Sequence, residues 1–87
     1  MVNAMTRFKV KDYAAWKSVF DENEDFRKSA GSASSKVFRS VDDPNDLAIL
    51  MQWDSIENGK KFASSDDLKK KMQQAGVISK PEFYFPG

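Results

Sequence analysis

The chain contains no cysteine and no histidine among its 87 residues. Without cysteine, disulfide bonds, thiol catalysis and thiolate metal sites are excluded. Without histidine, the chain has no imidazole ligand for a metal or a haem and no general base of the usual kind at neutral pH. We therefore expect a protein that carries no metal and no cofactor.

A strong charge of either sign and a long hydrophobic run are also missing. Fourteen basic residues against thirteen acidic ones give a net charge of +1, whereas nucleic-acid binding requires a concentrated positive field. No apolar run approaches the roughly 20 residues of a membrane span, and the N-terminus lacks the apolar core of a signal peptide. The sequence thus predicts a cytoplasmic protein whose partners include neither nucleic acid nor a membrane.

Aromatic residues, in contrast, are abundant: seven Phe, two Trp and two Tyr. Removing one such side chain from water is worth about 2–3 kcal/mol, so these residues are expected to form much of the core or of an interface. The length predicts a single domain over 1–87. A chain of this size buries only about 60–65% of its unfolded surface, so its core is thin.

The first third of the chain changes from strand to helix periodicity. Residues 2–10 alternate between apolar and polar, which predicts a half-buried strand. Asp12 is expected to cap a helix that begins at Tyr13 and ends at Ala30, where Gly31 can adopt the left-handed conformation.

A hairpin is predicted next. Residues 32–41 and 47–53 read as two strands, and the turn between them, 42–46, is rich in Asp, Asn and Pro. Residues 47–53 carry apolar side chains on both faces, which predicts a central strand buried on both sides.

Two short helices and a last strand complete the chain. Asp54 is expected to cap the first helix, and Ser64 or Ser65 the second, which ends at Gly76. Residues 81–85 predict the final strand.

This order predicts an α+β fold of the ferredoxin-like βαββαβ type, with the second helix split in two. Such a fold has a four-stranded antiparallel sheet with helices on one face only. The chain has no segment left to cover the other face, so we expect a second copy to cover it in a homodimer.

Two polar residues interrupt the apolar face of the first predicted helix. Asn23 lies near the middle of this face and Arg27 near its edge, at 100° per residue. In one interpretation Asn23 forms a local hydrogen bond and Arg27 extends to water. In the other, both side chains line a cavity under the helix.

Several motifs resemble the dimeric α/β-barrel superfamily of antibiotic biosynthesis monooxygenase-like proteins, which includes cyclase-like and uncharacterised members. The resemblance covers nearly the whole chain and rests on RFKVKDYAAWKxxF (7–20), VFRSVDDPND (37–46), QWD (52–54) and MQQAGV (72–77). It implies a homodimer with a barrel-like core and, in each subunit, a pocket for hydrophobic or aromatic small molecules. Characterised monooxygenases of this superfamily oxidise polyketide-type aromatics without metal or flavin.

The leading functional hypothesis is therefore a small-molecule pocket between helices and sheet. Its alternatives are a cofactor-free monooxygenase, a polyketide-cyclase-like enzyme, and a structural or regulatory dimer without a ligand. No catalytic residue is assigned. The candidate ligand-binding residues are aromatic side chains and the polar groups among them: Tyr13, Trp16, Phe20, Asn23, Arg27, Gln52, Trp53 and Phe62.

Overall fold

The computed structural model describes residues 1–86, which form four strands and four helices. They follow in the order β1 (Val2–Lys9), α1 (Tyr13–Glu22), α2 (Glu24–Ser29), β2 (Ser32–Arg39), β3 (Asp46–Trp53), α3 (Ile56–Ala63), α4 (Asp66–Gln74) and β4 (Glu82–Tyr84). The predicted α+β, ferredoxin-like order is confirmed. Both helical segments, and not only the second, are split in two.

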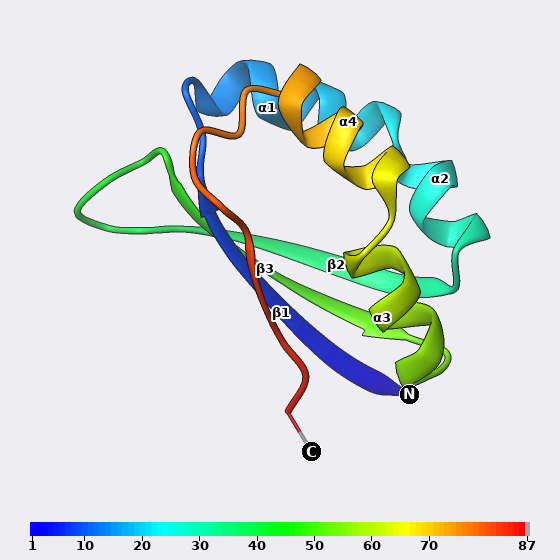
Figure 1. The fold of residues 1–87 in the computed structure, drawn as a ribbon. Helices are drawn as coiled ribbons and strands as arrows, with labels where there is room; N and C mark the ends of the chain where they lie inside the picture. The colour runs from blue at the N-terminus through cyan, green and yellow to red at the C-terminus, as the bar shows by residue number, and fades with distance from the viewer. Residues whose placement is uncertain (87) are drawn as a thin grey trace.

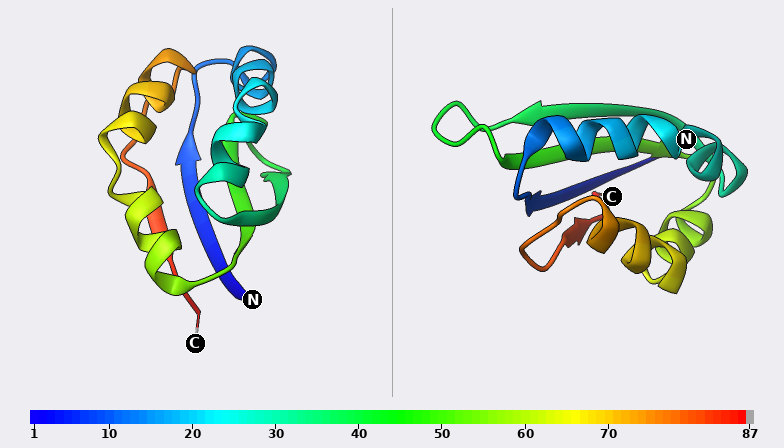
Figure 2. Two further views of the ribbon diagram at one scale, coloured as in Figure 1. Left: turned by 90° about the vertical axis from the view of Figure 1, so that its right-hand side faces the viewer. Right: turned by 90° about the horizontal axis from the view of Figure 1, so that it is seen from above.

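The sheet has the strand order β2-β3-β1-β4, and all neighbouring strands are antiparallel. The helices lie over one face of this sheet and leave the other face uncovered (Figures 1 and 2). Figure 2 also shows that α1 and α2 form one row over the sheet, while α3 and α4 form a second row.

The helix predicted from Tyr13 to Ala30 is interrupted at Asn23, so that prediction is wrong in its length. The backbone N–H and the side-chain Nδ2 of Asn23 both donate to the carbonyl of Val19, at 3.2 and 2.8 Å. An amide side chain that bonds its own preceding turn competes with the helical ladder, and α1 ends here. Gly31 has the predicted positive φ, +110°, after the end of α2.

Short polar side chains start the helices. The Asp12 carboxylate accepts from the Ala15 N–H, as predicted. For α3 the cap is Ser55 rather than Asp54, because the Ser55 hydroxyl accepts from the Asn58 N–H at 3.2 Å. Ser65, one of the two predicted candidates, caps α4.

Alternation along β1 and β3 separates the two faces of the sheet. On the helix side Ala4, Thr6 and Phe8 are buried, and they pair with Met51, Ile49 and Leu47 of β3. On the other side the intervening residues are exposed or half-buried. The prediction that β3 is buried on both faces is therefore wrong for a single chain, although β3 is an internal strand.

Candidate functional site

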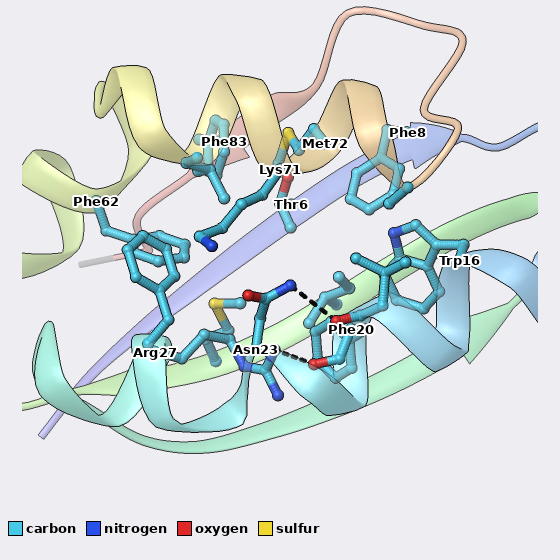
Figure 3. A pocket seen from close by; sticks show the side chains of 16 residues that line it. Thr6, Phe8, Trp16, Phe20, Asn23, Arg27, Phe62, Lys71, Met72 and Phe83 are labelled. Carbon is cyan, nitrogen blue, oxygen red and sulfur yellow. Dashed lines mark hydrogen bonds between the residues drawn. The ribbon is translucent and has the colours of Figure 1, made fainter.

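A cavity of about 60 Å³ lies between the helices and the sheet, and sixteen side chains line it (Figure 3). β1, β3 and β4 supply its floor, α1 and α2 one wall, and α3 and α4 the opposite wall. The hollow thus lies between the two rows of helices, over the middle of the sheet.

Two aromatic clusters flank this cavity. In the first, Trp16 packs on Phe8 and stacks on Phe20, with ring centroids 5.7 and 4.8 Å apart. In the second, Phe62 packs on Phe26 and Trp53 at 5.6 and 4.8 Å. Interlocked rings are stiff and apolar, so the cavity has walls suited to a flat apolar molecule.

Thr6 places a hydroxyl group in this apolar floor. The residue is only 5% exposed, and its Oγ1 has no hydrogen-bond partner among residues 1–86. A buried hydroxyl without a partner costs about 1–3 kcal/mol. Thr6 lines the cavity, but its Oγ1 is closed to solvent, so a ligand or a water molecule reaches it only when neighbouring side chains move.

Arg27, on α2, is buried beside the first aromatic cluster. Its guanidinium carbon lies 3.6 Å from the centroid of the Phe20 ring, and Nη1 donates to the Phe20 carbonyl at 2.6 Å. The residue is 7% exposed. Burial lowers the pKa of Arg27, while the negative charges of Glu24 and Asp21 act in the opposite direction.

Each of the two interpretations of Asn23 and Arg27 is partly correct. Asn23 forms the local hydrogen bond described above and also lines the cavity. Arg27 lines the cavity too, and its side chain is buried rather than extended to water.

Lys71, on α4, supplies a second cation. Its side chain is half-buried and points into the hollow in Figure 3, with Nζ 4.8 Å from the centroid of the Phe26 ring. The ion pairs of the described residues join Arg7 to Asp46, Lys17 to Asp21 and Lys28 to Glu24, so neither Lys71 nor Arg27 has a carboxylate partner there. No Asp or Glu of residues 1–86 lines the cavity.

Five of the eight candidate residues line this cavity together: Trp16, Phe20, Asn23, Arg27 and Phe62. Tyr13 does not. It lies under the guanidinium of Arg39, 3.8 Å from its ring centroid, in a more polar groove of about 370 Å³ beside β2.

The other two candidates lie elsewhere. Trp53 is fully buried in the second aromatic cluster, beneath Gly59, and does not reach the cavity. Gln52 was misplaced: strand alternation directs it to the uncovered face, where it is exposed and its Oε1 lies 3.2 Å from the Ser34 hydroxyl. Neighbours in a strand cannot both face the helices.

Thr6 and Lys71 were not among the predicted residues. Thr6 fits a strand pattern as well as any β-branched residue does, so the pattern does not indicate a role for its hydroxyl. Lys71 belongs to a run of three lysines, 69–71, and such a run usually indicates a solvated surface. The sequence does carry one signal, which is the spacing of Lys71. It lies three residues after Leu68, and Leu68, Met72 and Ala75 are the residues of this helix that face inward.

No group of three or more Asp, Glu, His or Cys residues within 1–86 is arranged to hold a metal ion. Among the helices of this same part of the chain, none has the length and apolar character needed to cross a membrane.

The fold matches solved structures, although no family sequence model and no curated protein sequence matches the chain. A candidate antibiotic biosynthesis monooxygenase from Bordetella bronchiseptica superposes with a TM-score of 0.82 at 14% identity, over 99% of this chain and 94% of that one. A similar candidate from Caulobacter crescentus gives 0.74 at 16% identity, over 98% and 86%. SnoaB, a cofactor-independent oxygenase from Streptomyces nogalater, gives 0.71 at 18% identity, over 95% and 89%.

The chain therefore shares the ferredoxin-like α+β fold of these solved structures, as the sequence motifs indicated. At identities this low the similarity establishes the fold alone.

Proposed function

We propose that the chain binds a hydrophobic or aromatic small molecule in the cavity between its helices and its sheet. The observation that carries this proposal is the hollow itself, which two aromatic clusters flank at the centre of a small domain. Since a thin core gains stability when it is filled, a void kept at this position favours a binding role.

The size of the cavity limits the ligand. Its volume of about 60 Å³ is well below the roughly 300–1,000 Å³ of pockets for drug-sized ligands. It is also below the roughly 150 Å³ of a cavity that binds benzene. Even a one-ring ligand therefore requires the hollow to widen, by movement of the half-buried, unbranched side chains of Lys71 and Met72.

A cavity-filling variant tests the proposal. Neutral aromatic probes such as indole and toluene should raise the Tm of the protein, and Ala75→Leu should abolish the rise because Ala75 lines the hollow. Val19→Phe fills the hollow from a second lining position. It should also abolish the rise in Tm, and it provides the test if Ala75→Leu does not fold. Ala14→Leu makes the same chemical change on an exposed position of α1 and should leave binding unchanged. The absence of any Tm rise with these probes would contradict the proposal and favour a dimer without a ligand.

We further propose that the chain acts as a homodimer joined through the uncovered sheet face. This face carries exposed apolar side chains on three strands, with Met5 44%, Phe38 54% and Tyr84 64% exposed. An apolar sheet face of this kind is typical of interfaces. Sedimentation at micromolar concentration should give the mass of two chains; a well-folded single chain would contradict this arrangement.

The similarity to SnoaB favours a second candidate function, the cofactor-free oxygenation of an aromatic substrate. In such a reaction the protein binds and deprotonates the substrate, whose anion then reduces O₂. Lys71 and Asn23, which line the cavity, are the groups that can hold the resulting anion. Oxygen uptake with anthrone- or quinol-like substrates and a product heavier by oxygen would support it. A product lighter by water would indicate cyclase-like chemistry instead, and an unchanged substrate would reject both for that panel.

A further inference from the structure

We infer that the ligand of this cavity is an anion, specifically a single-ring aromatic monocarboxylate whose oxygens meet the Lys71 ammonium and the Thr6 hydroxyl. This inference rests on the proposed binding function and adds the chemical class of the ligand. Three independent observations support it: the charge balance of the lining, the unpaired Thr6 hydroxyl and the aromatic walls.

The charge balance of the lining is one-sided. Lys71 contributes a cation that belongs to none of the ion pairs of the described residues, and no Asp or Glu of residues 1–86 lines the cavity, whereas the charge of Arg27 is already opposed by Glu24 and Asp21. An anion that enters beside the Lys71 ammonium gains a charge-assisted hydrogen bond and meets no carboxylate of the lining. The lining thus favours an anion over a neutral molecule and opposes a cation.

Thr6 adds a second polar contact from the opposite side. Its Oγ1 lies in the floor of the cavity, on β1, whereas Lys71 enters from α4 (Figure 3). Its hydroxyl lacks a partner among residues 1–86 and its oxygen is closed to solvent. A ligand oxygen that reaches it as the hollow widens therefore gains a hydrogen bond without breaking any bond of the fold. Carboxylate oxygens accept such bonds readily.

The walls select the remainder of the ligand. Trp16, Phe20, Phe26 and Phe62 line the space around these two polar groups. Their faces suit a flat ring, and a strongly hydrated anion such as phosphate gains nothing from apolar walls. A benzoate-like molecule meets both requirements.

Benzoate and benzamide form the test pair, because they have the same shape and differ in charge at pH 7. Amide chemical-shift titrations should show that the wild-type protein binds benzoate about tenfold more tightly than benzamide. Equal affinity for the two probes would overturn the inference and leave the proposed aromatic site standing. Binding of neither probe, together with no Tm rise from indole or toluene, would overturn both.

Variants identify the groups responsible. Lys71→Met keeps most of the unbranched side chain and removes the charge, so it should weaken benzoate binding about tenfold and leave benzamide binding unchanged. Lys70→Met, at the neighbouring exposed position, should change neither. Thr6→Val should weaken benzoate binding more than benzamide binding. If Lys70→Met reduced benzoate affinity as much as Lys71→Met, general surface charge would explain the preference and the inference would be wrong.

Discussion

The two faces of the sheet are built from alternate residues of the same strands, yet they differ in completeness. On the helix side Thr6 and the other inward-facing strand residues are buried under the helices, beside the cavity described above. On the other side Met5 and the residues that pair with it remain partly exposed. The chain thus has a hollow on one face, where we propose a ligand, and leaves the other face uncovered, where we propose a second copy.

The largest expected effect is a loss of stability when a closely packed side chain on the helix-covered face of the sheet is removed. Trp53→Ala should lower the free energy of unfolding by about 3–5 kcal/mol, because Trp53 is fully buried against Phe62. Gln52→Ala, the adjacent residue on the uncovered face, should stay within about 0.5 kcal/mol. Urea denaturation at one fixed protein concentration measures both. Similar losses for the two variants would remove the distinction between the faces.

A charge placed on the uncovered face should act on assembly rather than folding. Leu50→Glu places one carboxylate from each copy in the proposed interface, so the dimer dissociation constant should rise at least about tenfold. Sedimentation over a range of concentrations measures this, and circular dichroism verifies the fold. Gln73→Glu, an exposed change on α4, serves as the control. If Leu50→Glu leaves the dissociation constant unchanged, the interface lies elsewhere.

A smaller effect, this time an increase in stability, is expected for a substitution at Thr6 in the floor of the hollow. Thr6→Val replaces an unpaired buried hydroxyl by a methyl group of similar shape, and should raise the free energy of unfolding by about 1 kcal/mol. Thr6→Ser keeps the hydroxyl and loses a methyl group, so it should be less stable than the wild type. A loss of stability in Thr6→Val would mean that the hydroxyl already has a partner.

The smallest effect is a pH dependence. Arg7 donates to the Asp46 carboxylate at 2.8 Å, and this hydrogen bond holds the pKa of Asp46 below its usual value. A depressed carboxyl pKa stabilises the fold above the unfolded-state pKa, and the contribution disappears as the pH falls through the folded-state pKa. Asp46→Asn should therefore flatten the acid limb of a stability profile below about pH 4.

The effect of salt on the Arg7–Asp46 ion pair also tests whether a second copy covers this face of the sheet. The Arg7 side chain is 67% exposed in a single chain, so added salt should weaken the pair in a monomer. A dimer that covers this face would shield the pair and reduce its response to salt. Equal salt responses in wild type and Leu50→Glu would contradict that coverage.

Much of the fold could be predicted because its signals are local. Strand alternation, the turn at 42–46 and the Asp12 cap each depend on a few adjacent residues, and all appear in the structure. The break at Asn23 was missed because helical periodicity continues through it. Only the competing hydrogen bond to the Val19 carbonyl reveals the break.

The site was less predictable because a cavity is a property of packing between distant segments. Periodicity identified the wall at Trp16, Phe20 and Arg27, since these residues share one side of a helical segment. It gave no information on which strand residues lie opposite that wall. Thr6 comes from another element, and a run of three lysines does not reveal which of them turns inward.

The most direct test of the account is an NMR measurement of intermolecular NOEs between unlabelled indole and the isotope-labelled protein. The account predicts NOEs from the indole ring protons to the methyl groups of Thr6, Met51 and Met72, which line the cavity. NOEs confined to Met5 and Leu50, on the uncovered face, would contradict it.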